Sequence, residues 1–159
     1  MNKTNKTNAM RLMDAAKIPY RAVEYEYDES DLGGEHVAAV TGMNPDQVFK
    51  TLVARGEKKG ILVFCIPVSC TLDLKKAAHA AGDKKVEMIH MKELLGLTGY
   101  IRGGCSPIGM KKQFKTIADS SAKNFDEIIF SGGRLGAQIE MNPNELADLL
   151  NMDFADIIK

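Results

Sequence analysis

Two apolar segments joined by a short glycine-bounded turn constrain the fold more than any other feature of the chain. Val48–Ala54 has the composition of a β-strand, and Ile61–Pro67 is a continuous apolar run. A short apolar run bounded by turn residues is typical of a strand buried on both faces. Between them, Gly56–Gly60 has the length and the glycines of a hairpin loop. The sequence therefore predicts an antiparallel hairpin whose second strand lies in the centre of a sheet.

The remaining segments predict short strands and short helices in an irregular order. Alternating apolar stretches predict strands over 22–27, 86–89, 100–102, 115–119, 127–131 and 137–141. Helical spacing predicts helices over 8–17, 35–40, 73–81, 90–95 and from 142 onward, with Asn8 and Asn142 as N-caps. A polar loop is expected over 28–34. Because regular βαβ alternation is missing, we expect an α+β fold with antiparallel pairing, in which helices surround a mixed, barrel-like sheet.

The length of the chain and its charge limit the possible domain organisation and the possible functions. The 159 residues suit one domain, and we expect a flexible polar N-terminus over 1–8 followed by a single domain over 9–159. Basic and acidic residues number 21 each, which disfavours a bulk nucleic-acid coat protein but leaves room for a local basic patch. The chain has no apolar run near the roughly 20 residues that span a bilayer, and its start lacks a signal-peptide core. Together with three cysteines in no zinc-finger spacing, this predicts a cytoplasmic protein.

Two glycine-rich turns and one lysine form the candidate site. The turns are Gly99–Gly109 and Ser131–Gly136, and Lys50 lies in the first strand of the hairpin. Glycine lets a backbone approach a ligand closely, and backbone amides beside a lysine suit a carbonyl oxygen that becomes negative during reaction. The first turn lacks the Gly-Lys-Ser/Thr ending of a phosphate-binding loop, and Ser106 lacks the Gly-x-Ser-x-Gly pattern of a nucleophile. A solvent-facing lysine and an ordinary tight turn are the alternatives at this point.

Other reactive residues show weaker patterns. Cys105 would need a nearby histidine to act as a nucleophile, and His36, His79 and His90 are far apart in the chain. Because no set of residues has metal-ligand spacing, we expect neither a metal nor an organic cofactor. Lysine pairs at 75–76, 84–85 and 111–112 would form a phosphate-binding patch if they shared one face.

Several segments, in the same order, resemble the YbaK/EbsC family of aminoacyl-tRNA deacylases, relatives of the editing domain of bacterial prolyl-tRNA synthetases. The similarity runs from about residue 10 to the C-terminus and rests on Asn44–Leu52, Leu72–Ala77, Lys84–Met88, Gly99–Gly109, Ser131–Arg134 and Phe154–Ile157. The resemblance implies a barrel-like sheet wrapped by helices. It also implies an enzyme that removes cysteine mischarged onto tRNA(Pro), acting in trans with prolyl-tRNA synthetase as its partner.

The resemblance further implies roles for particular residues. The essential lysine of the family corresponds to Lys50, with Thr51 beside it, and a family tyrosine corresponds to Tyr25. A family aspartate is replaced here by Gln138, whose neutral amide limits that position to hydrogen bonding. The family implies that the thiol of the substrate attacks its own ester carbonyl, so that no protein nucleophile is needed. The substrate-cradling loop of the family corresponds to Gly103, Gly104, Ser106, Pro107 and Gly109.

Three other functions stay open from the sequence alone. A related deacylase would remove another amino acid, such as alanine, and the volume of the pocket would decide between the two. A noncatalytic module would bind tRNA or the synthetase without the reaction, an alternative that Gln138 keeps open. The third is a small-molecule-binding protein unrelated to tRNA. The sequence predicts no particular oligomeric state.

Overall fold

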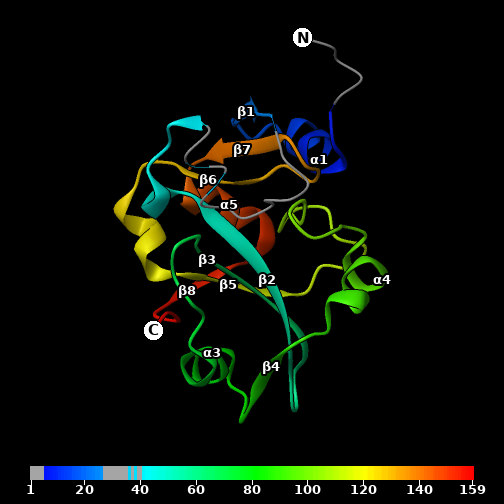
Figure 1. Ribbon diagram of the computed structural model, residues 1–159, viewed down its shortest axis with the longest axis vertical. Helices are drawn as coiled ribbons and strands as arrows, with labels where there is room; N and C mark the ends of the chain where they lie inside the picture. The colour runs from blue at the N-terminus through cyan, green and yellow to red at the C-terminus, as the bar shows by residue number, and fades with distance from the viewer. Residues whose placement is uncertain (1–5, 27–35, 37, 39–40) are drawn as a thin grey trace.

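The strands form two β-sheets with helices packed around them (Figure 1). The computed structural model describes residues 6–26, 36, 38 and 41–159. Its strands are β1 (Arg21–Glu24), β2 (Phe49–Gly56), β3 (Gly60–Pro67), β4 (Val86–Met88), β5 (Lys115–Asp119), β6 (Ile128–Ser131), β7 (Ala137–Met141) and β8 (Asp153–Ala155). The α-helices are α1 (Asn8–Ala16), α3 (Leu74–Ala81), α4 (Leu94–Thr98) and α5 (Pro143–Leu150). The 3-10 helices are η2 (Pro45–Gln47), η3 (Met91–Glu93) and η4 (Ser120–Asn124). The loop expected over 28–34 and most of the helix expected over 35–40 lie outside the described residues.

The predicted hairpin is confirmed and lies at the centre of the larger sheet. Strands β2 and β3 pair antiparallel from Phe49↔Pro67 to Gly56↔Gly60, and Gly60 has the left-handed φ of 74° that the turn requires. The order of this sheet is β4-β2-β3-β5-β8, so β3 has a neighbour on each side. The side chains of β3 are accordingly buried from Leu62 to the end of the strand.

Two pairings in the larger sheet are parallel, which corrects the antiparallel expectation. Strand β5 runs parallel to β3, and β8 runs parallel to β5. Between β3 and β5 the chain passes through α3, β4 and α4, and such a long crossover allows it to return in the same direction. Strand β8 escapes sequence-based prediction because it has only three residues. The strand expected over 100–102 is wrong, since these residues form an irregular turn.

A three-stranded sheet in the order β1-β7-β6 lies beside one end of the long hairpin (Figure 1). Both of its pairings are antiparallel. The two sheets meet at a parallel bridge between Val48, just before β2, and Ile129 in β6. The α+β class with surrounding helices is thus confirmed, whereas the strands form two joined sheets in place of a closed barrel.

Capping residues determine where the helices begin. Thr7, and not the expected Asn8, caps α1, because its Oγ1 accepts a hydrogen bond from a backbone amide one turn later at 3.1 Å. Asn8 lies inside the helix, and its Nδ2 donates to the carbonyl of Gly109 at 3.4 Å, which ties α1 to the first glycine turn. The N-cap expected at Asn142 is confirmed for α5, and Asp73 caps α3.

The central sheet has a different apolar cluster on each face. On one face, Phe64 and Ile66 of β3 belong to a cluster with Ala77 of α3. On the other face, Cys65 belongs to a cluster with Phe130 of the smaller sheet. Successive residues of β3 therefore point to opposite faces, as strand geometry requires. Within the described part of the chain, no helix is long and apolar enough to cross a membrane.

Candidate active site

Lys50 lies at the place where the two sheets meet. It follows Val48 by two residues, so the two side chains share one face of the extended chain. Val48 forms the parallel bridge to Ile129, and both side chains are buried in one apolar cluster. Ser131 follows Ile129 by the same two residues in β6. Lys50 and Ser131 therefore each lie two residues beyond the point where the two sheets meet.

Gln138 and Tyr25 extend this row across the smaller sheet. Gln138 in β7 is directly opposite Ser131 in β6 and directly opposite Val23 in β1. Directly opposed residues of an antiparallel pair point to the same face. Tyr25, two residues after Val23, is held beside the second glycine turn because its amide donates to the carbonyl of Gly136 at 3.0 Å. We call these four residues near the junction of the sheets and the second glycine turn, Lys50, Ser131, Gln138 and Tyr25, the polar row.

Gln138 carries a buried acceptor without a partner. The residue is 4% exposed, and its Oε1 has no hydrogen-bond partner among the residues that the structure describes. A buried polar atom left unpaired costs about 1–3 kcal/mol. An unpaired buried atom of this kind calls for an explanation, and a donor supplied by a bound water, ion or substrate is one.

Ser131 is a candidate that sequence reasoning missed. Its hydroxyl oxygen accepts a hydrogen bond from the amide of Gly133 at 3.2 Å, which shapes the turn after β6. The hydroxyl hydrogen has no acceptor among the residues that the structure describes, so it can be donated to a ligand. The only signal in the sequence is the place of Ser131 at the start of the second glycine turn. The register of β6 against β7 is what puts it directly opposite Gln138.

The structure brings the two glycine turns together. A Cβ atom added to Gly104 would lie 3.1 Å from the Cα of Arg134, and one added to Gly133 would lie 3.2 Å from the ring of Tyr100. Gly133 also has a φ of 108°, which disfavours other residues. Backbones can approach this closely only where no side chain intervenes. The second turn therefore holds the first in place, next to the end of the polar row at Ser131.

Hydrogen bonds inside the first turn involve Ser106. The Tyr100 hydroxyl donates to the carbonyl of Ile108 at 2.5 Å, and Ser106 Oγ accepts from the amide of Ile108 at 3.2 Å. Ser106 is fully buried and Pro107 is buried beside it. The structure thus places both residues inside the turn, where they determine its shape.

Beyond Gly99 at its start, which has a φ of 86°, two glycines of the first turn have left-handed backbones. Gly103 has a φ of 83° and Gly109 has a φ of 80°. A Cβ atom at Gly109 would also lie 2.9 Å from the Tyr100 hydroxyl oxygen. Both positions therefore require glycine for conformational reasons, and Gly109 requires it for space as well.

Thr51 points to the opposite face of β2 from Lys50. Its neighbours on that face, Phe49 and Val53, belong to the apolar clusters that include residues of the first glycine turn. Its hydroxyl oxygen lies 4.0 Å from the Sγ of Cys65. Thr51 is therefore on the side of the glycine turn, whereas Lys50 is on the side of the polar row.

The buried thiols are poor nucleophiles near neutral pH. Burial raises the pKa of Cys105 to about 12, and burial raises the pKa of Cys65 to about 12. The nucleophilic form of cysteine is the thiolate, which a pKa this high nearly eliminates at pH 7. The arrangement therefore favours chemistry that needs no protein thiolate.

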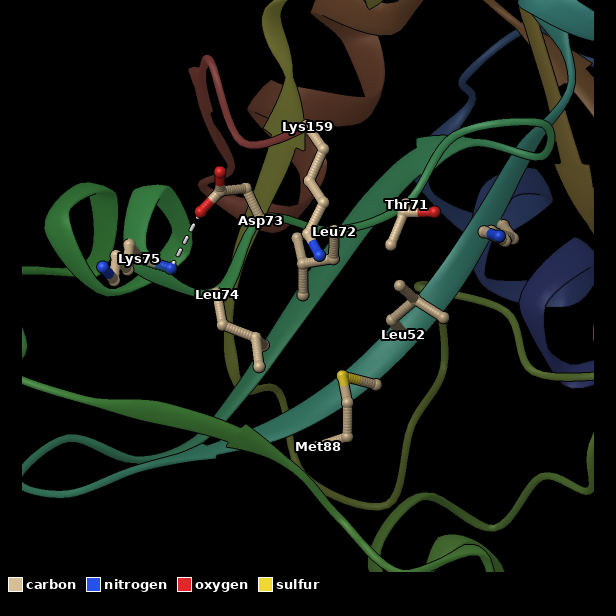
Figure 2. Close-up of a pocket in the computed structure, with 9 residues that line it drawn as sticks. Leu52, Thr71, Leu72, Asp73, Leu74, Lys75, Met88 and Lys159 are labelled. Carbon is tan, nitrogen blue, oxygen red and sulfur yellow. Dashed lines mark hydrogen bonds between the residues drawn. The ribbon is translucent and has the colours of Figure 1, made fainter.

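Lys50 also lines a hollow on the α3 side of the larger sheet (Figure 2). The hollow has a volume of about 580 Å³. Among the described residues, none from the two glycine turns contributes to its wall. The residues that line it are Lys50, Leu52, Thr71, Leu72, Asp73, Leu74, Lys75, Met88 and Lys159.

Known proteins share both the sequence and the fold of this chain. The sequence model of the aminoacyl-tRNA editing domain matches residues 33–149. The chain is 50% identical, over 152 residues, to an Enterococcus faecalis protein named "Putative Cys-tRNA(Pro)/Cys-tRNA(Cys) deacylase EbsC". The aligned region covers 96% of this chain and 93% of that protein. A Brachyspira hyodysenteriae proline–tRNA ligase is 27% identical over 85 residues, 54% of this chain and 15% of the ligase. A solved structure described as "a putative trans-editing enzyme for prolyl tRNA synthetase" superposes with a TM-score of 0.81 at 26% identity, over 97% of this chain and 98% of that one. The chain therefore belongs to the family of aminoacyl-tRNA editing domains.

Proposed function

We propose that the protein is a deacylase that acts in trans to clear Cys-tRNA(Pro). The observation that carries the proposal is the 50% identity, across 96% of the chain, to the Enterococcus faecalis protein named as a deacylase of cysteinyl-tRNA. An aminoacyl ester is already activated, so its site needs positioning and charge stabilisation more than a strong protein nucleophile. The activity belongs to translation in the cytoplasm, and prolyl-tRNA synthetase is the partner that delivers the tRNA.

The thiol of the substrate is the nucleophile in the proposed reaction. Its Sγ forms a bond to the ester carbonyl carbon, and the bond from that carbon to the ribose oxygen breaks. The thiol proton ends on the ribose oxygen, so the products are free tRNA and a cyclic thiolactone. Lys50 stabilises the negative charge that develops on the carbonyl oxygen. Gln138 Oε1, unpaired among the described residues, accepts a hydrogen bond from the α-ammonium of the amino acid.

A panel of three esters on the same tRNA tests this function. With Cys-tRNA(Pro), Ser-tRNA(Pro) and Ala-tRNA(Pro), we expect the cysteine ester to be cleaved at least about 100-fold faster, because a hydroxyl is a weaker nucleophile than a thiol and a methyl group is none. The measurement is release of the labelled amino acid, with mass spectrometry of the thiolactone. Equal cleavage of the alanine ester would make the protein a deacylase of another specificity. Absence of cleavage, with and without prolyl-tRNA synthetase, would favour a noncatalytic module.

Replacement of Cys105 by alanine should leave the reaction nearly unchanged. Because burial raises the pKa of Cys105 to about 12, its thiol stays protonated at pH 7 and takes no part in the chemistry. We expect kcat/KM for Cys-tRNA(Pro) within about threefold of wild type, and a stability loss of about 1 kcal/mol from the small cavity. The half-buried Cys70→Ala is the matched control. A loss above 100-fold in a folded Cys105→Ala variant would instead point to a covalent intermediate on this residue.

A further inference from the structure

The hollow beside α3 has an apolar wall that is accessible from outside. Figure 2 shows Leu52, Leu72, Leu74 and Met88 arranged around a common space. Leu74 is 40% exposed and Met88 is 44% exposed, unusually high for large apolar side chains. Exposed apolar residues gathered at a concave surface mark a site of interaction. The volume of about 580 Å³ lies in the range that holds a ligand of nucleotide size.

The same hollow collects positive charge from three separate segments of the chain. Lys50 comes from β2, Lys75 from α3 and Lys159 from the C-terminal segment. None of the three forms an ion pair within the described residues, whereas Lys76 pairs with Asp156 at 3.0 Å. Lys76 is therefore ion-paired within the protein, whereas the neighbouring Lys75 can contact a ligand.

Asp73, the one carboxylate side chain among the described lining residues, caps the helix. Asp73 Oδ1 accepts the amides of Lys75 at 3.0 Å and Lys76 at 3.1 Å. The backbone hydrogen bond from Lys76 is the largest cause that holds the pKa of this carboxyl below its usual value. Among the described lining residues, three lysine side chains stand against one carboxylate side chain, so this part of the wall is positive.

Backbone pairing holds Lys159 at the hollow. Its amide donates to the carbonyl of Thr71 at 3.0 Å, and the amide of Asp73 donates to Ile157 at 2.8 Å. An antiparallel bridge between Leu72 and residue 158 lies between these bonds. In Figure 2 the side chain of Lys159 extends toward Leu72. The positive charge is thus placed over the apolar wall by the fold.

We propose that this hollow binds the unpaired 3′-terminal segment of the RNA that carries the ester. The inference rests on the proposed function, because Lys50 belongs both to the hollow and to the polar row. A base packs on the apolar wall while the flanking phosphates contact Lys75 and Lys159, which leaves the ester at Lys50. Sites for single-stranded nucleic acid combine positive charge with a surface on which a base packs, and they read no particular base. Here that surface is aliphatic in place of aromatic.

Binding of a non-acylated RNA tests the inference separately from catalysis. The probe is a 5′-fluorescein single-stranded RNA of six nucleotides ending in CCA, followed by fluorescence anisotropy. The variant is Lys75→Gln/Lys159→Gln. The matched control is Lys58→Gln/Lys112→Gln, which removes the same charge from exposed positions that do not line the hollow. We expect the variant to bind at least about tenfold more weakly and the control to stay within about twofold of wild type.

The salt dependence and the kinetics give two further readouts. Each lost phosphate contact should reduce the slope of log K against log salt by about 0.7, so the variant should lose about 1.4. For Cys-tRNA(Pro), the variant should raise KM and keep kcat within about twofold.

Equal binding by variant and control, or no binding of the RNA by wild type, would overturn the inference even if deacylation is intact. RNA binding that depends on Lys75 and Lys159 in a protein that cleaves no ester would support the hollow and refute the proposed function. Loss of affinity for the synthetase with unchanged RNA affinity would assign the hollow to a protein partner and overturn the inference.

Discussion

Replacement of Lys50 by alanine should lower kcat/KM for Cys-tRNA(Pro) about 100- to 1000-fold in a protein that remains folded. This is the usual effect of removing one group that stabilises a developing oxyanion. Lys50 is half-buried and forms no ion pair within the described residues, so its removal leaves no buried charge without a partner. The free energy of unfolding should therefore change by no more than about 0.5 kcal/mol. Single-turnover deacylation and thermal unfolding followed by circular dichroism measure the two effects.

Lys58→Ala is the control for this experiment. Lys58 lies in the turn of the same β2–β3 hairpin and is exposed, so it removes an equal charge without touching the polar row. Its kcat/KM should stay within about twofold of wild type. Lys50→Ala with more than one-tenth of the wild-type kcat/KM would remove Lys50 from the mechanism.

Replacement of Gly104 by alanine should separate the two glycine turns and reduce both stability and activity. The added Cβ would lie 3.1 Å from the Cα of Arg134 and 3.3 Å from the amide nitrogen of Leu135, and a backbone cannot rotate away as a side chain can. Overpacking of this kind costs about 1–3 kcal/mol. A displacement of about 1 Å in the turn should lower kcat/KM about 100-fold. Urea unfolding and deacylation kinetics check the two values.

Gly96→Ala is the matched substitution at a permissive site. A Cβ atom at Gly96 meets no heavy atom within 4 Å, and the residue lies inside α4. Alanine is favoured over glycine in a helix by about 1 kcal/mol, so this variant should be as stable as wild type or more so. Wild-type activity in Gly104→Ala would show that the contact between the turns does not position the substrate.

Local sequence patterns predicted those elements whose partners are close in the chain. The β2–β3 hairpin is confirmed because its turn and its two strands are contiguous. The parallel pairing of β5 with β3 and of β8 with β5 could not be predicted, since parallel strands are joined by long crossovers that carry no register signal. The family expected from the ordered motifs is confirmed by the match to the editing-domain model and by the Enterococcus faecalis relative.

The sequence likewise indicated some residues of the candidate site and not others. Lys50 and the two glycine turns stood out because their residue types are unusual in their local context. Ser131 did not, because a serine before glycines is ordinary in a turn. The face that each side chain of β2 takes was also hidden, and it separates Lys50 from Thr51. The predicted roles of Tyr25, Gln138 and the residues of the first turn stay predictions, although their positions are now known.

The sequence by itself determined the central hairpin, the glycines that the turns require and the family, because each depends on contiguous residues or on motifs in a set order. Only the tertiary structure decided that the two sheets meet at Val48 and Ile129, just before Lys50, and that Ser131 lies opposite Gln138. It alone brought Lys159 to Lys50 and Lys75 around one hollow, through backbone bonds between the C-terminal segment and Thr71. The sequence gives the chemistry of each side chain directly. Strand register and the contacts between distant segments, in contrast, result from burial and hydrogen bonding of the whole chain.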